Sequence, residues 1–133
     1  MITIDTNVLV RLLVVDDARQ SDAARALVES QRVLIPRTVL LECEWVLRSR
    51  FKLDRKLICR YFEGLSETSG IEIEAESATR RAIDAYANGV DFADALHATT
   101  SPHVFHTFDA KLVRQRKRVP GADIAGVPVR RNR

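Results

Sequence analysis

The sequence predicts an α/β protein with a central parallel β-sheet flanked by helices on both faces. Short apolar runs rich in β-branched residues alternate with longer segments in which apolar residues recur at helical spacing. The chain has 133 residues, of which 46% are hydrophobic and 29% are charged. This is enough for one substantial core and too little for two. We therefore expect a single domain over residues 1–129 and a solvated basic tail over residues 130–133.

The expected elements follow from apolar patterning and from breaker residues. Pro36 closes one apolar run, Asn88-Gly89 suits a left-handed helix end, and Ser101-Pro102 stops a helix. The run at 71–74 alternates apolar and charged residues, so it is expected near a sheet edge. The expected strands are 2–4, 33–35, 71–74, 104–108 and a short one within 124–129. The expected helices are 6–14, 18–30, 38–51, 54–65, 75–87, 91–100 and 109–118.

The overall charge and the cysteine count indicate an ordinary cytoplasmic protein. The formal net charge of +3 is compatible with a polyanionic partner but does not by itself indicate one. Cys43 and Cys59 lie among apolar residues without metal-ligand spacing, so we expect reduced, buried thiols. Asp5 and Arg11 interrupt the first apolar run, so neither a signal peptide nor a contact with a membrane is expected.

Two aspartates occupy equivalent positions at the ends of predicted strands. Asp5 follows the first strand and precedes a helix, and Asp109 follows the strand at 104–108 in the same way. Ligands of open α/β sheets bind at the carboxyl ends of strands. If these two strands are parallel neighbours, both acids project from one edge of the sheet. The simpler alternative is that each aspartate only caps its helix.

A third acid lies at the margin of an apolar helix face. At 100° per residue, Glu42 falls beside the apolar arc of the helix at 38–51, between Val46 and Trp45. Glu44 points away from that arc and precedes Arg48 by four residues, which predicts a solvated ion pair. Glu42 is therefore the candidate functional residue of this helix, and Glu44 is not.

Asp91 and Asp94 are three residues apart and share a helix face. Asp91 is well explained as the cap of the helix at 91–100, with Asp94 favoured by the helix dipole. Asp94 is also embedded in an apolar pattern that leads into the core, which capping alone explains less well.

Convergence of Asp5, Glu42, Asp94 and Asp109 would require a cation or protonation. Two negative charges 4 Å apart repel by roughly 4 kcal/mol at an effective dielectric constant near 20. Because all the ligands are carboxylate oxygens, the matching ion is Mg²⁺ or Mn²⁺, which suits phosphoester hydrolysis by a bound water. A phosphoacceptor receiver domain would need an acid pair after the first strand and a lysine after the last, and the sequence has neither.

Four segments together resemble the acidic motifs of the PIN-domain nucleases, and more narrowly the VapC toxins of toxin–antitoxin pairs. These segments are Asp5-Thr6-Asn7-Val8-Leu9, Leu41-Glu42-Cys43-Glu44-Trp45-Val46-Leu47-Arg48, Asp91-Phe92-Ala93-Asp94-Ala95-Leu96 and Thr107-Phe108-Asp109. The resemblance implies a three-layer sandwich and a Mg²⁺- or Mn²⁺-dependent endoribonuclease. It also implies a homodimer and a cognate antitoxin whose tail enters the acidic pocket, and it allows a larger toxin–antitoxin assembly.

The resemblance assigns roles to individual residues. Asp5, Glu42, Asp94 and Asp109 take the catalytic and metal-binding positions, Asp91 is an additional acid near the metal, and Asn7 and Thr107 orient the ligands. Two features depart from the pattern. His97 stands where an apolar residue is usual, and the connection from Asp94 to Asp109 is about one helical turn shorter than usual.

A cluster of basic residues follows the fourth acid. Its members are Lys111, Arg114, Arg116, Lys117 and Arg118, and it is either a solvated helix face or a phosphate-binding surface for RNA. The helices within 38–65 carry more apolar residues than one face can bury, so they are expected to form the homodimer or antitoxin interface. The alternative to a nuclease is an inert PIN-like module that binds an antitoxin or another partner.

Overall fold

The structure is a computed structural model that describes residues 1–130, and its first sheet is parallel throughout. The strands β1 (Ile2–Thr3), β2 (Val33–Ile35) and β3 (Ile71–Ile73) lie in the order β1-β2-β3. Ile2 pairs with Val33, and Val33 with Ile71. The run at 71–74 therefore forms an edge strand, as its alternating pattern predicts.

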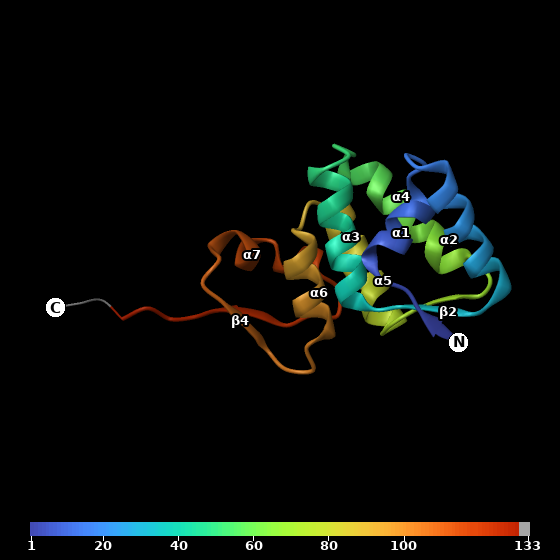
Figure 1. The fold of residues 1–133 in the computed structure, drawn as a ribbon. Helices are drawn as coiled ribbons and strands as arrows, with labels where there is room; N and C mark the ends of the chain where they lie inside the picture. Colours follow the sequence, from blue (N-terminus) through green and yellow to red (C-terminus); the bar gives the residue numbers. More distant parts are fainter. Residues whose placement is uncertain (131–133) are drawn as a thin grey trace.

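The C-terminal strands form a second, separate sheet. Strands β4 (Phe105–Thr107) and β5 (Ile124–Gly126) pair in parallel, with Phe105 opposite Ile124. The α/β class with parallel strands is confirmed. However, the strands that the sequence suggested as possible neighbours, β1 and β4, belong to different sheets. Figure 1 shows β4 extending away from β2, with α3 and α6 between them.

The helices agree with the predicted segments except near the C-terminus. The predicted helix at 109–118 is instead a five-residue helix followed by a 3₁₀ turn at Arg116–Arg118. The helices are α1 (Thr6–Leu13), α2 (Ala18–Ser30), α3 (Arg37–Ser49), α4 (Arg55–Glu67), α5 (Glu76–Ala87), α6 (Phe92–Thr100) and α7 (Ala110–Arg114).

Local signals set the ends of these helices. Asp17 and Asp54 cap α2 and α4 by accepting hydrogen bonds from the backbone N–H groups of Gln20 and Leu57. After α5, Gly89 has a φ of 99°, which is the left-handed conformation predicted for the Asn88-Gly89 pair. Both cysteines are free and buried, as expected.

One hydrophobic core joins the first sheet to the C-terminal segment. Phe92 of α6 packs against Phe62 of α4 and Tyr86 of α5, with ring centroids 5.5 Å and 5.1 Å apart. The buried side chains of Leu112, Val119 and Ile124 belong to this same cluster. The sheet formed by β4 and β5 is therefore attached to α5 and α6 rather than to the first sheet.

Two polar contacts hold the C-terminal segment at the end of α5. The side chain of Gln115 donates to the carbonyl of Gly89 at 3.3 Å, and Arg118 Nη1 donates to the carbonyl of Asn88 at 3.4 Å. The α6 helix ends at Thr100, and only residues 101–104 connect it to β4. The connection from Asp94 to Asp109 is therefore short, and the β4 strand that it reaches is not paired with β1.

The prediction of a basic tail concerns residues that lie largely outside the described part of the chain. Arg130 is exposed, and residues 131–133 are not described. In residues 1–130, no helix is long and apolar enough to cross a membrane.

The aromatic contact in the core predicts a large loss of stability on truncation. Phe62 is 0% exposed, so Phe62→Ala should lower the free energy of unfolding by about 3–5 kcal/mol in urea denaturation. Phe108→Ala is the matched control, because Phe108 is 76% exposed and its truncation should change stability by less than about 0.5 kcal/mol. Equal losses in the two variants would contradict this description of the core.

Candidate metal-binding and nuclease site

Asp5 and Asp109 both cap the helix that follows their strand. Asp5 Oδ1 accepts a hydrogen bond from the N–H of Val8 at 3.0 Å. Asp109 Oδ1 accepts from the N–H groups of Lys111 and Leu112 at 2.9 and 3.3 Å. These bonds fix the orientation of both carboxyl groups at the ends of β1 and β4. Capping and ligand binding are therefore compatible roles for these residues.

A contact between α3 and α1 places Glu42 close to Asp5. The buried hydroxyl group of Thr6 donates a hydrogen bond to Glu42 Oε1. Because Thr6 directly follows Asp5 in the chain, this bond positions Glu42 next to the end of β1. Glu42 is exposed, so its carboxylate is accessible at the margin of the apolar face, where the helical pattern predicts it.

Glu44 is not the solvated residue that the helical pattern predicts. It is only 4% exposed, and its carboxylate accepts hydrogen bonds from Tyr86 Oη and Arg48 Nε, both at 2.8 Å. The reason is that α6 packs against α3 and the Tyr86 side chain of α5 reaches Glu44, on a side of α3 that a single amphipathic stripe would leave to solvent. Burial, followed by the bond to Glu44, raises the pKa of Tyr86.

Asp94 lies between two other carboxylates. Asp91 caps α6 by accepting a hydrogen bond from the backbone N–H of Asp94 at 3.1 Å. Burial is the main cause that raises the pKa of Asp94, and the negative charges of Asp91 and Asp109 raise it further. His97 lowers the pKa of Asp94. Asp94 is therefore within electrostatic reach of both Asp91 and Asp109.

The acids come from different elements, and Glu42 of α3 and Asp91 of α6 line one cavity. Asp5 and Glu42 belong to the first sheet and its helices, whereas Asp94 and Asp109 belong to α6 and the second sheet. Within residues 1–130, no three Asp, Glu, His or Cys side chains are close enough to hold one metal ion. The donor types suit Mg²⁺ or Mn²⁺.

The predicted orienting residues accompany their acids. The backbone N–H of Asp109 donates to Thr107 Oγ1 at 2.9 Å, so Thr107 helps to define the turn that carries Asp109. Asn7 and Asp5 both line a cavity of about 340 Å³ beside α2. His97 lies elsewhere, in a cavity of about 540 Å³ between α3 and α6, with its ring stacked at 6.4 Å on Phe105.

A third cavity contains Trp45, to which the sequence patterns assigned no role. It measures about 470 Å³ and is lined by Glu42 and Asp91 together with Trp45 and Arg48. The Trp45 side chain is 58% exposed, and Arg48 Nε donates a hydrogen bond to the buried carboxylate of Glu44. The signal in the sequence was Trp45 itself, since a tryptophan next to a candidate acid is a potential stacking surface.

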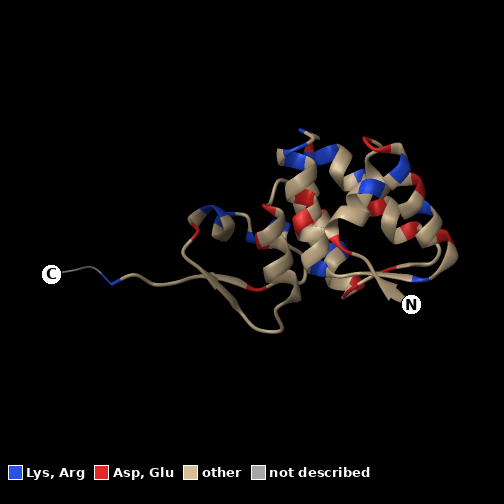
Figure 2. Ribbon diagram, viewed as in Figure 1, with Lys and Arg blue, Asp and Glu red and all other residues tan. Residues whose placement is uncertain are grey.

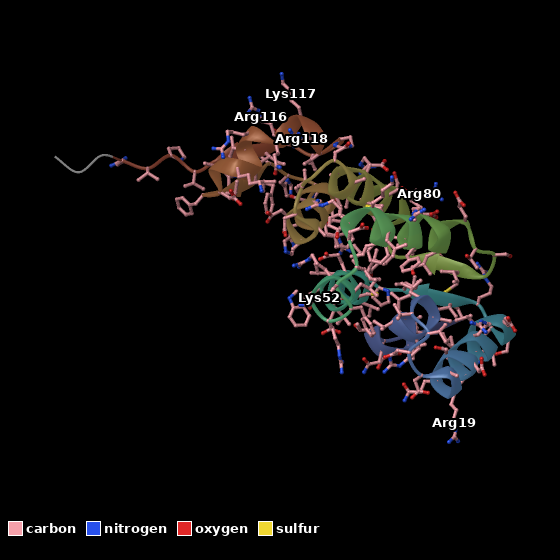
Figure 3. The ribbon with its side chains drawn as sticks, turned by 90° about the horizontal axis from the view of Figure 1, so that it is seen from above. Arg19, Lys52, Arg80, Arg116, Lys117 and Arg118 are labelled. Atoms are coloured by element: carbon pink, nitrogen blue, oxygen red, sulfur yellow. The ribbon has the colours of Figure 1, made fainter. Side chains whose placement is uncertain are left out.

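Basic residues gather in the segment that follows Asp109 in the chain. Figure 2 shows acidic positions along α3 and at the start of α6, and basic positions over α7. Figure 3 shows Arg116, Lys117 and Arg118 together at one end of the molecule, and Arg19 at the other end. Lys111 and Arg114 are exposed on α7, so all five members of the predicted basic cluster are exposed.

Comparison with known proteins gives one match. The family described as PIN domain matches residues 2–116, which is most of the chain and includes the four predicted acids. No curated protein and no solved structure matches the chain.

The position of Asp94 predicts a pH-dependent effect on stability. Because folding raises the pKa of Asp94, the free energy of unfolding decreases as the pH rises from the unfolded value near 3.8 through the folded value. Asp94→Asn should therefore be more stable than the wild type at pH 7 without divalent ions, and this difference should vanish below pH 3.8. Urea denaturation at both pH values tests this.

The control for this prediction is Asp22→Asn. Asp22 is exposed and only 3.6 Å from Arg25 in a surface ion pair, so its replacement should have little effect at either pH. An Asp94→Asn protein that is less stable than the wild type at pH 7 would show that Asp94 is not destabilised by its surroundings.

Proposed function

The chain belongs to the PIN domain family, whose members are generally nucleases, and we propose that it is a Mg²⁺- or Mn²⁺-dependent endoribonuclease. The observation that carries the proposal is the position of Asp94, whose charged form is disfavoured by burial and by Asp91 and Asp109. A divalent cation would remove this penalty. In this proposal Asp5, Glu42, Asp94 and Asp109 bind the ion, and Asp91 lies close to it.

Two further features favour a nucleic-acid substrate. The exposed cations on α7 and the 3₁₀ turn directly follow Asp109, where they would contact phosphates near the scissile bond. On the other side of the acids, Trp45 offers an exposed ring on which a base of single-stranded RNA could stack. Arg48, oriented by Glu44, would bind an adjacent phosphate.

We further propose that the protein acts as the toxin of a toxin–antitoxin pair, in the cytoplasm. The support is the likeness of the motifs at Asp5-Thr6-Asn7 and around Glu42 to those of VapC toxins. The antitoxin and homodimer contacts expected on the helices within 38–65 stay a prediction, and exposed Trp45 is their best candidate contact residue.

One observation favours the alternative of an inert binding module. In the described residues of a single chain, the acids do not form a group that could hold a metal ion. An inert module would show no metal binding in calorimetry and no RNA cleavage with Mg²⁺ or Mn²⁺, whereas the proposed nuclease would show both.

Replacing Asp5 tests the nuclease directly. Asp5→Asn should reduce RNA cleavage more than about 100-fold, because even residues that only support metal ligands contribute 10–100-fold. Asparagine is also a good helix cap, so the fold should be retained. Cleavage of a labelled RNA with Mg²⁺ or Mn²⁺ is the measurement.

The matched control is Asp54→Asn. Asp54 caps α4 through a 2.9 Å bond to Leu57 in the same way that Asp5 caps α1. This variant should cleave RNA at the wild-type rate, and equal activity of the two variants would refute the role of Asp5.

The basic cluster predicts a change in the salt dependence of RNA binding. In the inactive Asp5→Asn background, replacing Lys111 and Lys117 by Ala should reduce the slope of log K against log salt concentration by about 1.4, since each phosphate contact to a single strand contributes about 0.7. Replacing Arg19 and Arg25 of α2 should leave the slope unchanged. Filter binding at several salt concentrations measures both variants, and an unchanged slope in the first would show that the cluster is a solvated face.

A further inference from the structure

The cavity that Glu42 and Asp91 line also contains an exposed aromatic ring and a cation. Trp45 and Arg48 both line it, and its volume of about 470 Å³ is sufficient for a small ligand. Within α3, all of which the structure describes, Trp45 is the only large apolar side chain that is exposed. Its ring is therefore not part of a wider apolar stripe on this helix, and it is available to a ligand of the cavity.

Arg48 is held in one orientation by a buried carboxylate. Glu44 accepts hydrogen bonds from Arg48 Nε at 2.8 Å and from Arg48 Nη2 at 3.4 Å. The hydroxyl of buried Tyr86 donates to the same carboxylate at 2.8 Å, so Glu44 is fixed on its other side. The Arg48 side chain is nevertheless 51% exposed, and the pair uses only two of the five N–H donors of the guanidinium group. The other three donors are free to bind an anion.

Charge decides which part of a ligand can enter the cavity. Glu42 and Asp91 would repel a phosphate group there, and Arg48 is the only cation among the described residues that line the cavity. An uncharged nucleobase meets no such repulsion and gains stacking on Trp45. The phosphate of the same nucleotide would be bound outside the cavity by the free donors of Arg48. The cavity therefore fits one nucleotide of a longer strand.

We propose that the cavity of Trp45 and Arg48 binds one unpaired nucleotide of the RNA substrate, and that Glu44 is the positioning residue of this subsite. A base within a duplex is stacked on both faces, so it would have to be extruded before it could stack on a side chain. The substrate is therefore single-stranded RNA or the unpaired part of a folded RNA. This inference rests on the proposed nuclease function, because it takes RNA as the substrate of the neighbouring acids.

Exposed cations continue beyond the subsite at the end of α3. Arg50 and Lys52 directly follow this helix, and both are exposed. Figure 3 shows Lys52 beside α3, away from Arg116, Lys117 and Arg118. A strand that occupies the subsite therefore meets further positive charge next to α3, which favours binding of its neighbouring phosphates.

The fluorescence of Trp45 tests the subsite directly, because the chain has only one tryptophan. A short oligouridylate added to the inactive Asp5→Asn protein with Mg²⁺ should quench this fluorescence as a base stacks on the ring. The same strand annealed to oligoadenylate should not quench it. Equal quenching by the duplex would overturn the proposal, as would a single strand that binds in fluorescence anisotropy without quenching or does not bind at all.

Replacing Trp45 measures what the ring contributes to binding. Trp45→Leu should weaken binding of labelled single-stranded RNA by roughly 5- to 150-fold, since stacking of one base contributes about 1–3 kcal/mol. Trp45→Phe keeps an aromatic ring and should retain most of the affinity. Val15→Ala is the control and should bind normally, because Val15 is 64% exposed but lies between α1 and α2. If Trp45→Leu binds RNA normally but has a changed mass in light scattering, Trp45 is a protein contact and the proposal is wrong.

A double-mutant cycle tests the positioning role of Glu44. Glu44→Gln keeps the shape of the side chain but removes the charge that holds the guanidinium group. It should weaken RNA binding when Arg48 is present and have no further effect in an Arg48→Ala protein, because Glu44 acts through Arg48. Equal losses in both backgrounds would show that Glu44 only supports the fold. If urea denaturation shows that Glu44→Gln is unfolded, Tyr86→Phe, which removes the other bond to Glu44, replaces it in the cycle.

Two outcomes distinguish the subsite from the nuclease activity. If the wild type cleaves RNA with Mg²⁺ and Trp45→Leu does so with the same KM, the subsite is wrong and the proposed function stands. If single-stranded RNA quenches Trp45 but the wild type does not cleave it with Mg²⁺ or Mn²⁺, the subsite stands and the proposed function is wrong.

Discussion

The packing of Phe92 between Phe62 and Tyr86 is the contact on which the rest of the structure depends. It attaches α6 to α4 and α5, and the short connection after α6 then determines where β4 leaves the core. Since aromatic side chains bury large apolar areas, this attachment is strong compared with the few backbone hydrogen bonds of a three-residue strand. The second sheet therefore stays with α5 and α6.

Local hydrogen bonds hold three of the four candidate acids. Asp5 and Asp109 are each stabilised by the N–H groups of the helix that they cap, and Glu42 is stabilised by the hydroxyl of Thr6. Only Asp94 experiences a clear penalty, from burial and from its neighbours.

Glu44 has a structural role, because it helps to position the helix that carries Glu42. Its buried carboxylate joins Tyr86 of α5 to Arg48 of α3, so it sets the position of the helix that carries Glu42. A buried carboxylate is tolerated only when hydrogen bonds compensate for lost hydration, and here a hydroxyl and a guanidinium group do so. The same bonds orient Arg48 toward the cavity that contains Glu42 and Asp91.

The sequence by itself determined the α/β class, the approximate helices and most strands, and the capping roles of Asp5, Asp91 and Asp109. These features depend on local periodicity and on hydrogen bonds between residues close in the chain, which a single sequence displays directly. The edge position of β3 and the accessible position of Glu42 were predictable for the same reason.

Only the tertiary structure decided how these elements meet. Helical periodicity describes one buried face, so it could not show that α5 also covers Glu44. Nor could spacing show that β4 lies in a separate sheet, because strand pairing depends on contacts between residues far apart in the chain. Whether Asp5 and Asp109 share one site is a question of this second kind.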